Sequence, residues 1–264
     1  MQNILFSRSF TEKTNSILRR FWWQGVQVED SSKPFYFRSW DDIYQPKCVG
    51  GLGIRNLYTV NKSLVLHSAW LIVSNKDPFL SSVLKAKYFP NTSFWRAACH
   101  GTRFAFWSSV MQVKHHLQEQ CVVQIHQGNS NIWTDPWCEN WENIHTHLKN
   151  PHIHRQLPNL VSDLWNQKQS SWNRILINST FQHQAVDSIL QVHKVSSSSV
   201  DQLCWKHSIQ GTCSTKEVYK YLSIQNTHSL PSHGPSSISS AALSILIGSG
   251  IIKPCLASKL SVGD

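Results

Sequence analysis

Three glycines crowd into four positions of the sequence QPKCVGGLGIRNL, at Gly50, Gly51 and Gly53. Glycines grouped in this way allow the backbone to approach another group closely, which can be a bound phosphate or another part of the chain. Their spacing differs from the G-x-G-x-x-G pattern of dinucleotide-binding loops, which argues against a nucleotide cradle. The sequence therefore predicts a tight turn that leads into a helix near Asn56.

Two cations flank this turn, Lys47 on one side and Arg55 on the other. Both side chains are long enough to reach a phosphate backbone, and exposed amides in such a turn can do the same. A turn and a phosphate contact are compatible with each other. The sequence leaves open whether these two residues bind nucleic acid.

The first half of the chain has the periodicity of amphipathic helices. The first helix is expected over residues 9–24, with a capping-box pattern at Ser9 and Glu12 and an end at Gly25. Its expected apolar face holds Phe10, Ile17, Phe21 and Trp22. Residues 33–40 then alternate like a short strand or extended segment.

Three further helices are expected before residue 120. One covers residues 58–74, with its apolar positions near one face at Leu57, Val60, Leu64 and Leu71. The next begins with Asp77 as its cap and Pro78 in its first turn. The last has an apolar stripe formed by Phe106, Val110, Val113 and Leu117.

The pattern changes after residue 120. CVVQIHQGNSNIWTDPW, at 121–137, predicts two strands joined by a turn at Gly128 and Asn129. A helix is expected around 182–193. A second pair of strands is expected around Gly211.

Ser214 and Glu217 then form a capping-box pattern at the start of a short helix. From residue 223 the sequence is rich in serine, proline and histidine and nearly free of charge, which is typical of disorder. The expected fold class is α+β, in three parts. A basic helical region covers 1–118, a small mixed region with β-hairpins covers 119–222, and a disordered tail unrelated to them covers 223–264.

The positive charge lies in the first half. The chain has a formal net charge of +10, and residues 1–115 hold 15 Lys and Arg against 6 Asp and Glu, giving +9. Such an excess favours a phosphate-rich partner, RNA or DNA, over a merely soluble basic surface. The twelve tryptophans supply flat faces either for core packing or for stacking on bases, and composition does not decide between these uses.

The number of cysteines and the length of the apolar stretches indicate the cellular compartment of the protein. The seven cysteines are odd in number and widely spaced, which favours reduced thiols. We find no signal-peptide pattern at the N-terminus and no apolar stretch of about 20 residues, the length that a membrane span needs. We therefore expect an intracellular protein, cytoplasmic or nuclear, with no membrane contact and no small-molecule substrate.

Two groups of residues are candidates for metal binding. Asp41 and Asp42 are adjacent, as carboxylates are in polymerase metal sites, but they precede a proline–glycine loop and have few acidic neighbours in sequence. A solvated pair or a helix N-terminus is favoured instead.

Four histidines within ten residues are the second group. They are His145, His147, His152 and His154. No cysteine or carboxylate lies at ligand spacing inside this run, so a chance cluster is favoured over a zinc site. Because the sequence also lacks a G-x-S-x-G elbow and a phosphate loop, we expect no cofactor and no catalytic residue.

A long series of short motifs occurs in a fixed order. In the first half it comprises FWW (21–23), Trp40, PK (46–47), GGLGIR (50–55), Leu57, Asn61, AW (69–70), KAKYF (85–89) and Trp107. In the second half it comprises GN (128–129), IWTDPW (132–137), Trp172, D-x-L-x-W (201–205) and STKEVY (214–219). From about residue 15 to 222, the chain resembles the C-terminal connector region of the reverse-transcriptase polyprotein of plant LINE-type, non-LTR retrotransposons.

The resemblance implies a fragment that lies after the polymerase palm and stops before the zinc-binding domain, without the Y-x-D-D motif and without a ribonuclease H domain. Cys213 stands where the family usually has an aromatic residue, as in a decaying element. The expectation is a non-catalytic relic with residual nonspecific RNA or DNA binding. The expected binding residues are Arg19, Arg20, Lys47, Arg55, Lys62, Lys85 and Lys87. The alternative is a protein-interaction or structural fragment, or an open reading frame without a selected function.

Overall fold

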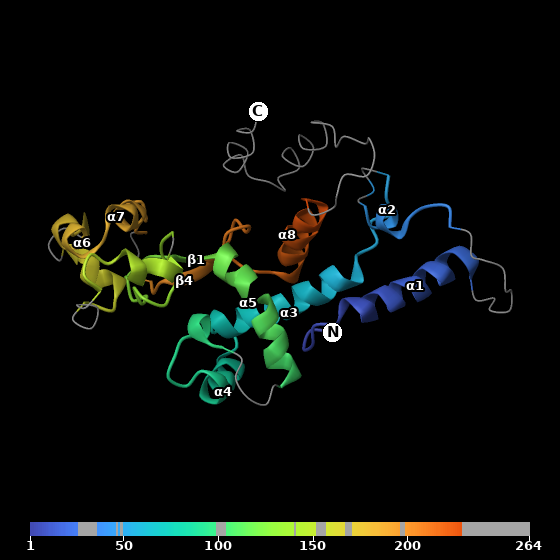
Figure 1. The fold of residues 1–264 in the computed structure, drawn as a ribbon, viewed down its shortest axis with the longest axis horizontal. Helices are drawn as coiled ribbons and strands as arrows, with labels where there is room; N and C mark the ends of the chain where they lie inside the picture. The colour runs from blue at the N-terminus through green and yellow to red at the C-terminus, as the bar shows by residue number, and fades with distance from the viewer. Residues whose placement is uncertain are drawn as a thin grey trace. The chain divides into compact units, whose positions relative to one another are not determined.

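Figure 1 shows a computed structural model of the chain. It describes residues 1–25, 36–45, 47, 50–98, 104–139, 141–151, 157–166, 171–195 and 199–228. The predicted disordered tail lies outside the described residues from 229 onward. We call residues 1–118 the first region and residues 119–222 the second region.

The first region is helical, as the sequence predicts. Its helices are α1 (Arg8–Gln24), α2 (Trp40–Tyr44), α3 (Leu57–Val73), α4 (Pro78–Tyr88) and α5 (Ala105–Gln120), with a 3-10 turn, η2 (Phe94–Arg96). Helix α3 contacts α1, α4 and α5, and α5 crosses it in Figure 1. This arrangement makes α3 the centre of the region.

Helix α1 forms over the expected residues but differs in its cap and its packing. The cap is Ser7 and not Ser9, because the Ser7 hydroxyl accepts a hydrogen bond from the Phe10 N–H at 3.2 Å. The expected apolar face is largely exposed, although the Phe10 ring contacts Phe6 with 4.8 Å between centroids. Its members Phe10, Ile17 and Phe21 are 50%, 69% and 57% exposed.

Helix α3 forms as expected, but its most buried face is not the predicted one. The predicted positions Leu57, Val60, Leu64 and Leu71 are only partly buried. The hydrophobic residues that are buried are Val65, Leu66, Ala69, Trp70 and Ile72. Because helices contact α3 from several sides, burial follows its neighbours and not one apolar stripe.

Two helix predictions are confirmed in detail. The Asp77 carboxylate accepts from the Leu80 N–H at 3.0 Å, and Pro78 opens α4. In α5, the stripe residues Val110, Val113 and Leu117 are fully buried. The Trp107 ring stacks on Tyr88 at the end of α4, with 4.6 Å between ring centroids, so α4 and α5 share one aromatic core.

The segment predicted to be extended over 33–40 is partly wrong. Residues 33–35 lie outside the described residues, 36–39 form no strand, and Trp40 begins α2. The Ser39 hydroxyl caps this helix by accepting from the Asp42 N–H at 3.0 Å. A local cap therefore outweighs the alternating pattern.

The second region contains a two-stranded sheet that the sequence does not predict. Strand β1 (Cys121–Gln124) pairs antiparallel with β4 (Gln202–Trp205), with Cys121 opposite Trp205. The first strand of each predicted hairpin forms, but both local pairings are wrong, because β1 and β4 pair with each other and residues 132–134 form turns. The Trp205 N–H bonds to the Gly211 carbonyl at 2.8 Å, which closes a turn where a second strand was expected.

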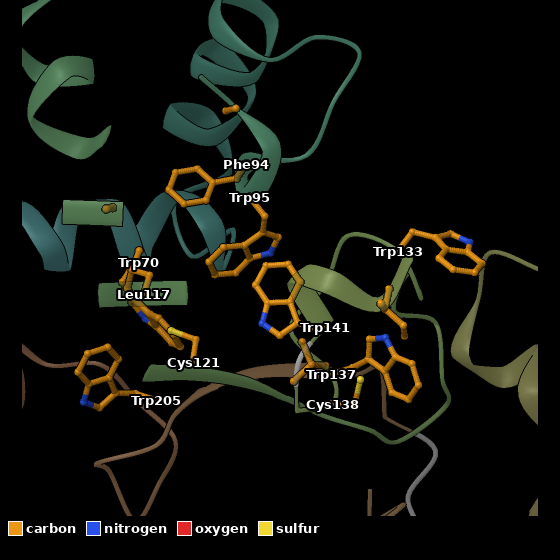
Figure 2. Packing of buried hydrophobic residues seen from close by; sticks show 14 of the residues in the cluster. Trp70, Phe94, Trp95, Leu117, Cys121, Trp133, Trp137, Cys138, Trp141 and Trp205 are labelled. Carbon is orange, nitrogen blue, oxygen red and sulfur yellow. The ribbon is translucent and has the colours of Figure 1, made fainter. Parts of the chain in front are cut away.

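The other elements of the second region are short. They are η3 (Trp141–His147), η5 (Val161–Leu164), β2 (Trp165–Asn166), β3 (Ser171–Trp172), α6 (Arg174–Thr180) and α7 (His183–Leu190). Strands β2 and β3 pair antiparallel, and α7 matches the helix expected around 182–193. Buried tryptophans of the second region join the core of α3 and α5, as Figure 2 shows for Trp137, Trp141 and Trp205.

Helix α8 (Thr215–His228) begins near the end of the second region and extends past it. Its capping box is confirmed, because the Ser214 N–H donates to the Glu217 carboxylate at 3.1 Å and the Glu217 N–H donates to the Ser214 hydroxyl at 3.3 Å. The first part of the expected disordered tail, residues 223–228, is helical and continues α8. In the described residues, no helix combines the length and apolar character of a membrane span.

Candidate nucleic-acid interface

The glycine turn packs against the backbone of its own chain. The Gly53 N–H bonds to the Gln45 carbonyl at 2.9 Å, and a Cβ on Gly51 would lie 2.0 Å from that oxygen. Gly50 has a φ of 88°, which glycine adopts without strain. The Asn56 side chain then caps α3. The predicted turn into a helix is confirmed, and the close approach is to the end of α2.

The two cations beside the turn are both exposed. The Arg55 guanidinium lies over the Tyr219 ring of α8, 5.7 Å from its centroid. The Tyr219 hydroxyl accepts a hydrogen bond from the Asn56 N–H at 3.1 Å. Arg55 is thus placed by the contact of α8 with the start of α3, whereas Lys47 projects from the turn.

The other predicted cations are spread over the helices of the first region. On α1, Arg20 is exposed and Arg19 lies over the Tyr36 ring at 4.7 Å. Lys85 and Lys87 are exposed in the last turn of α4, where cations also stabilise the helix dipole.

These cations do not converge on one point. Arg55 lies at the N-terminal end of α3, while α4 follows its C-terminal end (Figure 1). A helix of 17 residues is about 25 Å long at 1.5 Å per residue. The predicted residues are therefore spread over several helices and do not line one pocket.

Lys62 differs from the other predicted cations because it is half-buried on α3. Burial lowers its pKa, and the positive charge of Arg8 lowers it further. Arg8 lies over the Tyr58 ring at 5.6 Å. Arg8 is not among the cations that the sequence predicts to bind nucleic acid. The sequence contains one signal for its neighbours, the i, i+4 spacing that places Tyr58 and Lys62 on the same helix face.

Two motifs of the second region, GN (128–129) and D-x-L-x-W (201–205), stabilise its structure through hydrogen bonds to each other. The Asp201 carboxylate accepts hydrogen bonds from the N–H groups of His126, Gly128 and Ser130 at 2.7, 2.9 and 2.8 Å. It also accepts from the Ser130 hydroxyl at 2.7 Å. The Asn129 side chain accepts from the Asp201 N–H at 2.9 Å. The GN and D-x-L-x-W motifs thus close one loop onto β4.

The pKa of Asp201 reflects this loop. Burial raises the pKa, but the hydrogen bonds from Ser130, His126 and Gly128 outweigh burial and leave it below its ordinary value. A carboxylate held in this way stays ionised. Its charge is satisfied by backbone amides, so it stabilises a loop and is not free to bind a metal.

The histidine run is partly described. The His145 ring stacks on Trp133 with 5.0 Å between centroids and contacts the Arg96 guanidinium. His147 is half-buried in η3, and His152 and His154 lie outside the described residues. Within the described part of the chain, no three His, Cys, Asp or Glu side chains are grouped to hold a metal ion. Asp41 and Asp42 lie in the first turn of α2, which matches the helix N-terminus expected for them.

Two proteins of Arabidopsis thaliana are similar to this chain. A protein named "uncharacterized mitochondrial protein" is 26% identical over 134 residues, which are 50% of this chain and 84% of that protein. A protein named "putative ribonuclease H protein" is 25% identical over 230 residues, which are 85% of this chain and 36% of that protein. The chain thus spans about a third of the length of this second relative. No family model and no solved structure matches the chain.

Proposed function

We propose that the chain derives from the reverse-transcriptase polyprotein of a plant LINE-type, non-LTR retrotransposon and binds RNA or DNA without sequence preference. The ordered motifs support this origin. So does the similarity of 85% of the chain to a plant protein named for ribonuclease H. The fragment would be non-catalytic, since it contains no Y-x-D-D sequence and its adjacent carboxylates lie in the first turn of a short helix.

One observation carries the proposed binding: the positive charge of the first region is not neutralised within it. Residues 1–115 have a net charge of +9. In the described residues of this region, no Lys or Arg forms an ion pair with a carboxylate. Cations without internal partners are available to phosphates, and release of counterions from the nucleic acid then drives association.

A salt titration tests this proposal. Binding to a single-stranded RNA should weaken steeply as salt rises, with a log–log slope of about −0.7 for each phosphate contacted. Replacing Lys47 and Arg55 with glutamine should reduce the slope, whereas Lys149→Gln in the second region serves as the control. A chain that binds no RNA even at low salt would refute the proposal.

The alternative is a structural or protein-interaction fragment, or a reading frame without a selected function. One observation favours it: eight of the twelve tryptophans are buried in the core. They have no face left for base stacking. Trp22 is 50% exposed, so an RNA that stacks on the protein should quench Trp22 and leave the buried rings unchanged. Fluorescence that does not respond to RNA at low salt, together with no binding, favours this alternative.

A further inference from the structure

Two cations crowd together where α1 begins beside α3. Arg8 lies over the Tyr58 ring, 5.6 Å from its centroid, and Lys62 follows Tyr58 by one turn on the same face of α3. Lys62 is half-buried, and the positive charge of Arg8 acts on it. The charge of Lys62 also acts on the buried His116 of α5, whose ring lies tilted against His115 with 4.0 Å between centroids. In the described residues, no ion pair joins this group to a carboxylate.

The fold holds Arg8 in this place. The buried side chain of Asn61 on α3 accepts a hydrogen bond from the Phe6 N–H at 2.7 Å and donates to the Ile4 carbonyl at 2.8 Å. The Ser109 hydroxyl of α5 accepts from the Leu5 N–H at 2.9 Å. The segment before α1 is thereby tied to two helices, and Arg8 follows it directly.

The nearest acidic residues in sequence do not neutralise the two cations. Glu12 lies one turn after Arg8 on α1, and Glu119 lies one turn after His115 on α5. Neither carboxylate pairs with a cation in the described residues. Two like charges, one of them partly removed from water, oppose folding, and a bound anion would relieve that repulsion.

We propose that Arg8 and Lys62 form a phosphate-binding site on the first region. The chemistry suits a phosphate, because the Arg8 guanidinium lies over the Tyr58 ring and can present its planar donors to two oxygens, while Lys62 supplies a point charge. The site rests on the proposed nucleic-acid binding and gives it a defined contact. Its phosphate comes from a nucleic-acid backbone or from a free phosphate, which the test separates.

The experiment compares three full-length proteins: the unchanged chain, the site variant Arg8→Gln/Lys62→Gln and a matched control. The control, Lys85→Gln/Lys87→Gln, loses the same charge on α4. In chloride, Lys62→Gln alone should unfold at a higher temperature than the unchanged chain, because it removes a half-buried charge. Adding inorganic phosphate at constant ionic strength should stabilise the unchanged chain and the control by mass action, and should not stabilise the site variant. RNA affinity should fall about tenfold more in the site variant than in the control.

The outcomes separate the two proposals. Equal responses of site variant and control to phosphate and RNA would overturn the site while leaving nucleic-acid binding intact. A phosphate response that depends on Arg8 and Lys62, without RNA binding, supports a free-phosphate site and overturns the proposed function. If Arg8→Gln/Lys62→Gln does not fold, Arg8→Lys replaces it. That variant keeps the positive charge but loses the paired donors of the guanidinium, so an unchanged phosphate response would count against the site.

Discussion

Helices α1 and α3 have the same length, 17 residues, and both were predicted from apolar periodicity, yet they are buried to different extents. Helix α3 buries eight of its residues, whereas α1 buries only Thr11. Most aromatic and aliphatic side chains of α1 are exposed, although Trp23 contacts Phe37, while those of α3 contact α4 and α5. An apolar stripe thus shows which face of a helix can pack, but not whether the chain supplies a neighbour for it.

The comparison also separates two sources of helix stability. Helix α1 depends on its Ser7 cap and on the hydrogen bonds that tie the preceding segment to Asn61 and Ser109. Helix α3 is held mainly by burial, which contributes most of the stability of helices in proteins. Substitutions should therefore cost far more around α3 than on the apolar face of α1.

The largest effect is expected for Trp107→Ala. The Trp107 side chain is 1% exposed and stacks on Tyr88 and Phe89, so its loss leaves a cavity in the core beside α3. The free energy of unfolding should fall by about 4 kcal/mol, measured by urea denaturation.

Phe21→Ala on α1 is the matched aromatic control. It should change the free energy of unfolding by less than about 0.5 kcal/mol. A cost of several kcal/mol for Phe21→Ala would show that α1 is packed in solution, and the contrast between the two helices would fail.

A substitution of a buried polar contact tests whether apolar packing alone determines which substitutions destabilise the fold. Asp201→Ala removes a carboxylate that accepts four hydrogen bonds and leaves three amides without that partner. We expect a loss of about 3 kcal/mol at neutral pH, with Asp201→Asn intermediate. Because the pKa of Asp201 is lowered in the folded state, its contribution is present above the unfolded pKa of about 3.9 and disappears as pH falls through the folded value. Urea denaturation at pH 7 and pH 3 checks both expectations.

Predictions from the sequence succeeded where the signal lies within a few residues of the structure it produces. The Asp77 cap, the Ser214–Glu217 capping box and the glycine turn depend on neighbours in sequence, so local chemistry was sufficient. The pairing of β1 with β4 joins distant segments, and each strand also carried a local turn signal that pointed to a nearer partner. Arg8 lies near Lys62 only because α1 packs beside α3. No residue spacing in the sequence predicts that packing.

Two glycine substitutions compare the turn that precedes α3 with the turn that ends α1. A Cβ on Gly51 would lie 2.0 Å from the Gln45 carbonyl oxygen, whereas Gly25 has open space around it and only a positive φ of 72°. Gly51→Ala must displace backbone and should cost about 2 kcal/mol. Gly25 combines a φ of 72° with a ψ of −153°, which residues other than glycine rarely adopt, so Gly25→Ala should cost about 1 kcal/mol from backbone strain alone. Equal costs in thermal unfolding would show that the contact with α2 is absent in solution.

The last effect is a slope against pH and not a single cost, and it acts on the α3 side of the comparison. Burial, together with the charges of Lys62 and His115, lowers the pKa of His116 to about 3. The unfolded chain binds a proton at this residue near pH 6.5, while the folded chain does not. Stability should therefore fall as pH decreases below about 6.5, by up to about 1.4 kcal/mol per pH unit, until the folded residue titrates.

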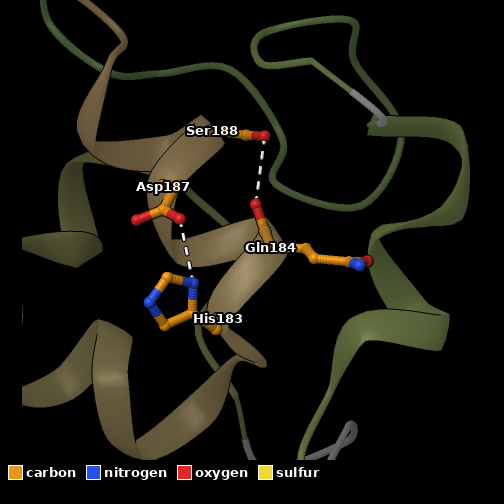
Figure 3. Close-up of polar contacts among 4 residues, drawn as sticks. All are labelled: His183, Gln184, Asp187 and Ser188. Carbon is orange, nitrogen blue, oxygen red and sulfur yellow. Dashed lines mark hydrogen bonds and ion pairs between the residues drawn. The ribbon is translucent and has the colours of Figure 1, made fainter.

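His116→Leu should flatten this acid dependence relative to its own stability at pH 8. His183→Gln is the matched control, because His183 is exposed on α7 and pairs with Asp187 at 2.9 Å (Figure 3). That variant should keep the slope of the unchanged chain. If His116→Leu keeps the full slope as well, His116 is solvated in solution, and the junction of α3 with α5 is then as open to water as the apolar face of α1.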